Sequence, residues 1–383
     1  MRILLTNHVP FQTSVSGALM RMLAQGLISS GDQAECLIVD RVGQGEEPFP
    51  VHRVVCSEKD SDAGAAAPLP SFTSVPSSHV TFDQLTDPQI GAYRSQLRKG
   101  INRVVDALDP QIIHCLHLWV QGALVLETGV PYVLSAQSTN LLGVEQDPRY
   151  REWAEQAAEN AGRIIANSFW MANEICQRFD VEPNRVATVR HGVDCDAFQA
   201  EGASPRELAA QLGLPEGPII LFSGKLMDVQ GGDVLLHAAA DYESRIEDSV
   251  TILAGDGPRL ADWKRLADEL KLRRVFFLGD RSRLDLVSLY RAAKLMVLPT
   301  RVDPFEIAYL EAFAAGTPVV SCRVGAMAEI IYEEIGGFVQ PDDPTALADM
   351  ITQAVQEDWK SSKGPLARLY AVEQHNLTDW VSR

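Results

Sequence analysis

The chain has 383 residues, 46% of them hydrophobic and 22% charged, which favours two globular domains and excludes an intrinsically disordered protein. Its net charge of −17 makes nucleic acid and anionic membranes poor general partners, although a peripheral membrane contact through a local basic helix stays open. No apolar run reaches the roughly 18 to 20 residues that span a bilayer. The six scattered cysteines form no CxxC pair, which predicts free thiols in a reducing, cytoplasmic compartment and no structural zinc site.

The first 195 residues alternate short β-rich runs with helical periodicity, which is typical of a mostly parallel sheet with helices on both faces. Strands are predicted at 2–7, 35–39, 111–114, 132–136, 163–167 and 186–190. Helices are predicted at 17–30, 84–108, 120–127, 149–160 and 171–179. Residues 57–81 are rich in Ser, Pro and Ala and are predicted to form an exposed, mobile insertion.

A stretch rich in Gly, Asp, Ala, Ser and Pro, 192–205, is interpreted as the interdomain connection, and the alternation restarts over 206–360. Strands are predicted there at 218–223, 250–254, 275–278, 295–299, 318–321 and 337–340. Helices are predicted at 233–240, 259–270, 284–292, 307–315, 326–332 and 344–357. The amphipathic segment 361–383 is predicted to cross back to the first domain. The chain thus predicts two doubly wound, Rossmann-like α/β domains facing a central cleft, with ligands at the carboxyl ends of the strands.

The most informative segment is 303–311, Asp-Pro-Phe-Glu-Ile-Ala-Tyr-Leu-Glu, which is followed by Gly-Thr-Pro-Val-Val at 316–320. Its two outer carboxylates, Asp303 and Glu311, bracket the start of a helix and can bind hydroxyl groups at both ends of an elongated ligand. The free N–H groups of the helix start can hold phosphates between them. A nucleotide-sugar site needs this chemistry, although carboxylates near helix starts also occur simply as caps.

Further landmarks precede this segment in a specific order. They are Ser223-Gly224-Lys225-Leu226, Gln230-Gly231, Gly255-Asp256-Gly257-Pro258 and Phe277-Leu278-Gly279. In this combination the chain resembles the retaining glycosyltransferases of the GT-B fold, family 4, strongly over 186–356 and more weakly over 1–185. The His-Gly-Val-Asp at 191–194 resembles that family's connector. The resemblance implies sugar transfer from a nucleotide-diphosphate sugar, with UDP as the expected nucleotide, and no metal or other cofactor.

The same resemblance assigns roles within the 303–311 segment. Glu311 would bind the ribose hydroxyls, and Asp303 stands where the family has a glutamate beside the reacting sugar. Phe305, Glu306 and Ile307 would supply backbone N–H groups to the sugar and phosphate. The family commonly has glycine in place of Glu306, whose carboxylate therefore either selects an amino sugar or points away. A simple N-cap role remains the alternative for Asp303.

Both of the family's phosphate-binding cations are altered in this chain. Lys225 replaces an arginine, which keeps the charge but loses the bidentate fork. Gln230 replaces a lysine, and its neutral amide can hydrogen-bond a phosphate but cannot neutralise it. Arg301 or Arg190 is a candidate replacement from a neighbouring loop.

Three positions of the first domain also match the family. Gly17 falls in its glycine-rich loop and would let the backbone approach donor phosphate or acceptor, although an ordinary helix start is an equal alternative. His114 and His117 resemble a His-x-His motif with one extra residue between them. His117 is predicted to contact the donor sugar and His114 to pack, against the alternative that His117 is also structural. Gln137 replaces a further histidine.

The sequence therefore predicts a retaining, metal-independent, hexosyltransferase-type glycosyltransferase with a small-molecule or glycan acceptor. The predicted catalytic residues are His117, Asp303 and Lys225, and the predicted donor-binding residues are Gly17, Gln230, Phe305, Glu306, Ile307 and Glu311. One alternative is a non-catalytic nucleotide- or sugar-binding paralogue, which the departures at 137, 230, 303 and 306 motivate. Another is an epimerase of the same fold, for which no clear set of acid and base residues is visible. The donor sugar and the acceptor are not readable from the sequence.

Overall fold

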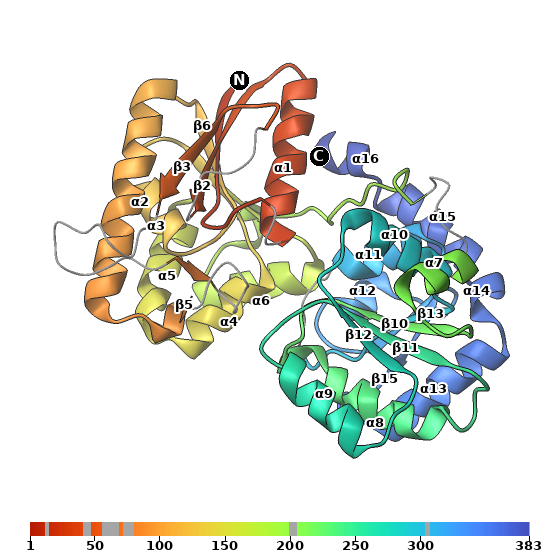
Figure 1. The fold of residues 1–383 in the computed structure, drawn as a ribbon. Coiled ribbons are helices and arrows are strands. Elements are labelled where there is room, and N and C mark those ends of the chain that lie inside the picture. Colours follow the sequence, from red (N-terminus) through yellow and green to blue (C-terminus); the bar gives the residue numbers. More distant parts are fainter. Residues whose placement is uncertain are drawn as a thin grey trace. The chain divides into compact units, whose positions relative to one another are not determined.

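The computed structural model in Figure 1 describes residues 1–11, 15–40, 47–55, 69–71, 80–198, 205–302 and 307–382. It divides into two compact units, one formed by Met1–Arg190 with Val381–Arg383 and the other by His191–Trp380. Both are α/β units, each with its own parallel sheet. Within the described ranges no helix combines the length and the apolarity needed to cross a membrane.

The first unit holds a seven-stranded parallel sheet in the order β3-β2-β1-β6-β7-β8-β9. Its strands are β1 (Arg2–Thr6), β2 (Gln33–Asp40), β3 (Val51–Val55), β6 (Ile112–Cys115), β7 (Tyr132–Ser135), β8 (Arg163–Ala166) and β9 (Val186–Thr188). Two short strands, β4 (Pro70–Ser71) and β5 (Val80–Thr81), pair with each other. The chain builds the sheet outward from β1 in one direction and from β6 in the other, so the strand order reverses between these two neighbours.

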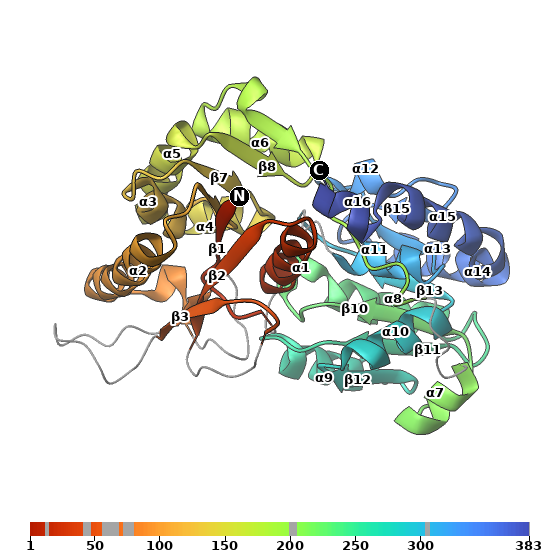
Figure 2. The ribbon, with the colours of Figure 1, turned by 90° about the horizontal axis from the view of Figure 1, so that it is seen from above.

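Side-chain alternation along β1 explains how the first unit forms two helical layers. Ile3 and Leu5 join a cluster with Met20 and Ala24, whereas Leu4 joins a larger cluster on the opposite face because successive side chains of a strand point to opposite faces. The first cluster includes Met20 and Ala24 of α1, and Figure 2 shows α2 and α3 on the other side of the strands from α1. The helices are α1 (Val15–Ser29), α2 (Asp87–Leu108), α3 (Gln121–Leu126), α4 (Ser138–Gln146), α5 (Arg151–Asn160) and α6 (Phe169–Phe179), with short 3-10 turns η1 (Phe82–Gln84), η2 (Pro148–Tyr150) and η3 (Pro183–Arg185).

The second unit holds a six-stranded parallel sheet in the order β12-β11-β10-β13-β14-β15, with its reversal between β10 and β13. Its strands are β10 (Ile219–Ser223), β11 (Val250–Ala254), β12 (Val275–Gly279), β13 (Leu295–Leu298), β14 (Val319–Cys322) and β15 (Gly336–Val339). All residues of β10, β11, β13 and β14 are buried, as expected where helices cover both faces of a parallel sheet.

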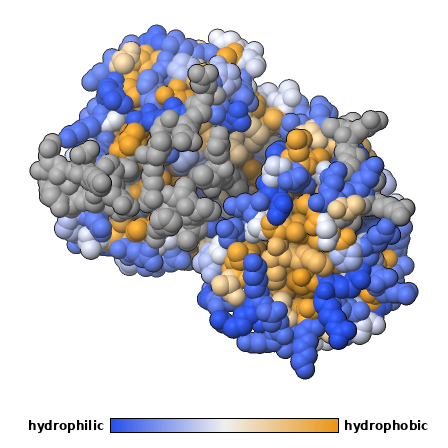
Figure 3. Space-filling model, viewed as in Figure 1, coloured by the Kyte–Doolittle hydropathy of each residue, from blue (hydrophilic) through white to orange (hydrophobic). Residues whose placement is uncertain are grey.

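The helices of the second unit also form two layers. In Figure 1, α8, α9 and α13 lie on one face of the sheet, and α7, α10 and α11 lie on the other. The helices are α7 (Pro205–Leu212), α8 (Gly232–Tyr242), α9 (Leu260–Glu269), α10 (Arg283–Ala292), α11 (Ile307–Ala314), α12 (Met327–Ile330), α13 (Pro344–Gln356), α14 (Trp359–Ser362), α15 (Gly364–Gln374) and α16 (Leu377–Ser382), with the 3-10 turn η4 (Asp228–Gln230). In Figure 3, hydrophilic residues cover much of the face shown and surround a hydrophobic area on the second unit.

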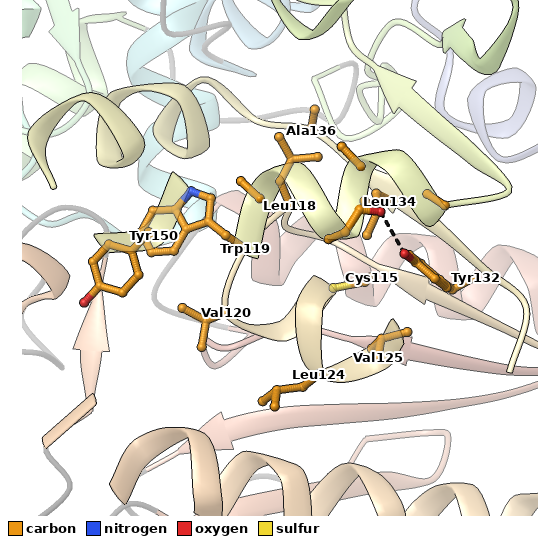
Figure 4. Close-up of a cluster of buried hydrophobic side chains, with 14 of the residues drawn as sticks. Cys115, Leu118, Trp119, Val120, Leu124, Val125, Tyr132, Leu134, Ala136 and Tyr150 are labelled. Carbon is orange, nitrogen blue, oxygen red and sulfur yellow. Dashed lines mark hydrogen bonds between the residues drawn. The ribbon is translucent and has the colours of Figure 1, made fainter. Parts of the chain in front are cut away.

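A buried aromatic stack anchors the segment that follows β6. The rings of Trp119 and Tyr150 lie with centroids 4.4 Å apart inside the larger core cluster (Figure 4). In the same cluster the Tyr132 hydroxyl donates a hydrogen bond of 2.7 Å to the Ala157 carbonyl, which satisfies its polar atom away from water. Because Trp119 is two positions after His117, the stack also holds the loop that carries this predicted site residue.

Every strand predicted from the sequence is present, within two residues at each end. The prediction missed β3, α4, α7 and α14, and it placed no strand at β4 or β5. It was also wrong to treat all of 57–81 as exposed, because Leu69 and Ser71 are each only 2% exposed. Leu69 joins the large core cluster and Ser71 lies in β4, which pairs with β5. Residues 57–68 and 72–79 of that segment lie outside the described residues.

The predicted interdomain connection, 192–205, is described over 192–198 and at Pro205, where α7 begins. The part over 192–198 is packed within the second unit. The Val193 N–H donates to the His375 carbonyl at 2.7 Å, and the Val193 carbonyl accepts from the Leu377 N–H at 3.2 Å. A Cβ on Gly192 would lie 3.0 Å from the Leu377 Cα. These contacts give His-Gly-Val-Asp a structural role.

Candidate functional site

In each unit, candidate residues lie at the two strand ends where the strand order reverses. In the first unit, His8 follows β1 and His117 follows β6; in the second, Lys225 follows β10 and segment 299–302 follows β13. Open α/β sheets bind ligands outside the carboxyl ends of their strands at such reversals. The sequence prediction and the topology therefore select the same edge of each sheet.

Two histidine rings lie against each other at the first of these edges. The centroids of His8 and His117 are 4.1 Å apart and the ring planes are inclined by 33°. His8 is fully buried and His117 is 2% exposed. Burial lowers the pKa of His8 to about 3. Burial also lowers the pKa of His117 well below its ordinary value, and the neighbouring His8 adds to the effect. Both rings are therefore neutral at pH 7.

A buried asparagine from α4 holds the His117 ring. Asn140 Nδ2 lies 2.9 Å from His117 Nδ1. Its Oδ1 accepts from the backbone N–H groups of Gln137, at 3.1 Å, and Leu118, at 3.4 Å. Gln137, which replaces a family histidine, donates through Nε2 to the Leu116 carbonyl at 3.2 Å. The start of α4 is thus tied to the end of β6.

The other histidine of the predicted motif, His114, lies within β6. Its Nε2 is 2.7 Å from Ser135 Oγ on the neighbouring strand β7, and burial lowers its pKa to about 4. Further along, Val120 precedes α3 with φ 57° and ψ −70°, a conformation that is strained for a β-branched residue. A strained residue this close to His117 is consistent with a functional site.

Gly17 has a packing reason to be glycine. It lies in α1, where a Cβ would be 2.2 Å from the Pro10 carbonyl oxygen and 2.8 Å from Phe11 Cα. This contact explains the residue without a ligand, so its glycine identity does not by itself indicate phosphate binding.

Glycines bring two loops of the second unit into backbone contact. A Cβ on Gly255 would lie 1.9 Å from the Gly224 carbonyl oxygen, and a Cβ on Gly257 would lie 2.4 Å from that of Leu226. Only glycine permits so close an approach of one backbone to another. The loops after β10 and β11 therefore fix each other, and Lys225 lies between the two contact points.

A second backbone contact positions Gln230. Gly231 has φ 70°, and a Cβ there would lie 2.0 Å from the Pro299 carbonyl oxygen. The Arg301 N–H donates to the Val229 carbonyl at 2.8 Å. Gln230, 3% exposed, is thus held against the segment that follows β13 and leads into 303–306.

The structure assigns Arg301 a different role from the one the sequence suggested. Its guanidinium forms a two-bond pair with Asp233, at 2.9 and 2.7 Å, and its Nε donates to Asp342 at 2.6 Å. Two carboxylates already neutralise this cation, which argues against it as a substitute for the missing phosphate ligand. In the first unit, the Arg190 guanidinium lies 5.8 Å from the centre of the Phe169 ring.

Glu311 lies in α11 with a side chain only 12% exposed and forms an ion pair with Arg283, the first residue of α10. The Arg283 guanidinium also lies 5.0 Å from the centre of the Phe198 ring. Nearby, the Tyr290 hydroxyl donates to Ser223 Oγ at 2.9 Å, and burial together with the Glu311 charge raises the Tyr290 pKa. The Glu311 carboxylate, which is predicted to bind the ribose, is therefore partly buried and held in place by Arg283.

The remaining predicted residues are placed only in part. Ile307 is the first residue of α11, whereas Asp303, Phe305 and Glu306 lie outside the described residues. Across the part of the chain that the structure describes, no group of three or more His, Cys, Asp or Glu side chains could hold a metal ion.

Sequence reasoning missed His8, Asn140 and Arg283. His8 had a usable signal, because it follows the first strand of the unit as His117 follows β6. Asn140 lies in the unpredicted helix α4, and Arg283 is one of several arginines near a helix start. Nothing in the sequence pattern marked these two.

Both halves of the chain match known protein families. Residues 20–197 match the family described as Glycosyltransferase Family 4, and residues 205–364 match Glycosyl transferases group 1. The D-inositol 3-phosphate glycosyltransferase of Salinispora tropica is 32% identical over 62% of this chain, which spans only 55% of that relative. That of Salinispora arenicola is 30% identical over 75% of this chain and 70% of its own length. The D-inositol 3-phosphate glycosyltransferase 2 of Catenulispora acidiphila is 31% identical over 71% of both.

Solved structures resemble the chain along almost its whole length. Sucrose-phosphate synthase from Thermosynechococcus elongatus has a TM-score of 0.80 and 19% identity, covering 99% of this chain and 96% of its own. Anabaena HepE in complex with UDP and glucose has a TM-score of 0.77 and 19% identity, covering 100% and 97%. At such low sequence identity, the similarity to these two structures establishes the fold and nothing further. With the two family matches and the relatives, they show that the chain belongs to the family 4-like glycosyltransferases of the GT-B fold.

Proposed function

We propose that the chain is a retaining, metal-independent glycosyltransferase that moves a sugar from a UDP-sugar to a small-molecule or glycan acceptor. The observation that carries the proposal is that residues matched to the family's site lie where the strand order of each sheet reverses. They are His117 in the first unit and Lys225 and Gln230 in the second. Complexes of Anabaena HepE with UDP and with UDP-glucose support UDP as the nucleotide.

On the donor side, negative charge grows on the departing diphosphate while the anomeric carbon becomes oxocarbenium-like. Lys225 would face this charge, held in place by the glycine contacts of its loop. Backbone N–H groups around Phe305 and Ile307 would stabilise the same charge further, because fixed donors stabilise the transition state more than the ground state. Glu311 would hold the ribose, and Asp303 would contact the reacting sugar. The roles of Asp303, Phe305 and Glu306 rest on sequence alone.

For the acceptor we propose front-face attack, in which the leaving phosphate oxygen helps to deprotonate the incoming hydroxyl. This route depends on positioning rather than on an enzymic nucleophile, so it needs no pair of carboxylates of the glycosidase kind. The relatives are named D-inositol 3-phosphate glycosyltransferases, which makes D-inositol 3-phosphate the first acceptor to test. Free thiols at Cys36, Cys115, Cys176, Cys195 and Cys322 support a reducing, cytoplasmic compartment.

Thermal unfolding with UDP, GDP, ADP or TDP in the presence of EDTA tests the donor side of the proposal. We expect UDP to raise the melting temperature, since a ligand that binds only the folded state stabilises it. No stabilisation by any of the four nucleotides would contradict the proposal.

A second candidate is a paralogue that binds a nucleotide or a sugar but does not catalyse sugar transfer. Two observations favour it: Gln230 is neutral, and Arg301 is already paired with Asp233 and Asp342. Mass detection of UDP-sugar consumption over an acceptor panel separates the two functions. Tight UDP binding without consumption or hydrolysis of any donor would support the paralogue.

A further inference from the structure

The amide of Asn140 can lie in only one orientation. Asn140 is the third residue of α4, and its Oδ1 accepts from the N–H of Gln137, the N-cap residue, and from the N–H of Leu118. Reversing the amide would turn an NH₂ group toward these two N–H donors and lose both hydrogen bonds. The backbone therefore identifies which terminal atom of Asn140 is oxygen and which is nitrogen.

This orientation fixes the hydrogen on His117. The Asn140 atom that lies 2.9 Å from His117 Nδ1 is Nδ2, and an amide NH₂ group can only donate. Nδ1 must then accept, so it carries no hydrogen. In a neutral imidazole the single hydrogen is then on Nε2. This assignment of the tautomer needs only the contact of His117 Nδ1.

The surroundings of His117 maintain the neutral ring. It is 2% exposed, and the His8 ring, which follows β1, lies against it with the centroids 4.1 Å apart and the planes inclined by 33°. Protonating His117 would place a charge in this buried environment and set an N–H of the ring against the Asn140 NH₂ group. Both effects oppose the imidazolium form.

We propose that Asn140 is a positioning residue that holds His117 as the neutral tautomer with its hydrogen on Nε2, so that His117 meets substrate as a hydrogen-bond donor and not as a base. The catalytic consequence rests on the proposed function, whereas the tautomer does not. A donor suits the proposed reaction, since the leaving phosphate and not His117 would take the acceptor proton. His117 would then contribute by binding an oxygen of the sugar or the acceptor.

The tautomer is measurable without any substrate. In protein labelled with ¹⁵N-histidine, a ring nitrogen without hydrogen resonates far from an N–H nitrogen, and the His117 signals are those that vanish in His117→Gln. We expect hydrogen on Nε2 and none on Nδ1 at pH 7 to 8. Hydrogen on Nδ1, or a charged ring, would overturn the proposal whatever the enzyme's activity.

Asn140→Asp supplies the matched test, because a carboxylate oxygen facing Nδ1 can only accept. We expect the His117 hydrogen to move to Nδ1 in this variant. Asn167→Asp, another buried asparagine of the same unit, is the control and should leave the His117 tautomer unchanged. If Asn140→Asp folds but His117 keeps its hydrogen on Nε2, Asn140 does not set the tautomer. If it does not fold, Asn140→Ala, which leaves Nδ1 without its donor, should yield a mixture of tautomers, and a pure Nε2 form would contradict the proposal.

The consequence for turnover is measured separately. Loss of one fixed donor in an active site costs about 10²-fold in kcat, and we expect that loss in Asn140→Asp with a smaller change in KM. Unchanged kcat together with a shifted tautomer would contradict the donor role of His117, but the tautomer assignment would remain valid. Absence of turnover in the wild type would instead count against the proposed function.

Discussion

The ion pair between Arg283 and Glu311 joins the start of α10 to α11 and holds the carboxylate that the sequence assigns to the ribose. Arg283 contacts Oε1 of Glu311. A carboxylate has room for several hydrogen bonds, so the same group can accept ribose hydroxyls while the arginine fixes its position. The pair therefore leaves Glu311 able to make the proposed contact with the ribose while fixing its position.

Glu311→Ala should weaken UDP binding by about 10- to 100-fold, the equivalent of losing hydrogen bonds to a charged group. Arg283→Ala should weaken it only about threefold, because the carboxylate remains but is less well held. Titration calorimetry measures both constants, with Glu269→Ala on the exposed face of α9 as the control. Equal affinity of Glu311→Ala and wild type would remove Glu311 from the site.

Gln230→Lys should raise the affinity for UDP about 10-fold by restoring a charged hydrogen bond to the diphosphate. The affinity for uridine, which has no phosphate, should stay the same. Because position 230 is 3% exposed, the new ammonium should also lower the stability of the ligand-free protein. A parallel gain for uridine would show that the added charge does not act on the phosphates.

Gly255→Ala should destabilise the second unit by at least about 3 kcal/mol, because the new Cβ overlaps backbone that cannot move without separating two loops. Gly213→Ala is the matched control, since φ is also positive there, at 66°, but nothing lies within 4 Å of the new Cβ. It should cost only about 1 kcal/mol from backbone strain. Urea unfolding compares the two variants, and equal losses would refute the backbone contact.

The buried histidine pair predicts how stability depends on pH. The pKa of His8 is about 3 in the folded protein against 6.5 as its ordinary value, so below pH 6.5 the unfolded chain binds a proton that the native state excludes. Stability is therefore full above pH 6.5 and falls on acidification, by about 2 kcal/mol for this histidine between pH 6.5 and 5.

Urea unfolding at several pH values checks this slope in wild type and in His8→Leu. The substitution should flatten the slope, whereas His237→Asn, at an exposed position, should leave it unchanged. An identical slope in His8→Leu and wild type would mean that His8 does not contribute to the acid sensitivity.

The fold was predictable because its signals are local. Runs such as Leu295–Leu298 read as strands, and the Gly-rich motifs mark the loops after β10 and β11. The missed elements lack such signals. Strand β3 is a short sequence with His52 and Arg53 at its centre, and α4 carries Gly143 and a mixed polar surface. Composition alone could not show that Leu69 is buried.

The sequence indicated where the candidate site residues lie relative to the strands and helices, but not which residues they contact. His117 and Lys225 each follow a recognisable strand, and Glu311 lies within a recognisable helix. Their partners come from elsewhere in the chain: Asn140 is 23 positions from His117, and Arg283 is 28 positions from Glu311. Such pairings depend on tertiary packing, which no local periodicity encodes.

The most direct test of the central claim is the rate at which wild type and Lys225→Ala consume UDP-sugars in EDTA with D-inositol 3-phosphate and a panel of other acceptors. We predict that the wild type releases UDP, that the product keeps the anomeric configuration of the donor, and that Lys225→Ala lowers kcat by about 10²-fold or more. No consumption of any donor by the wild type, an inverted product, or full activity in Lys225→Ala would contradict the account.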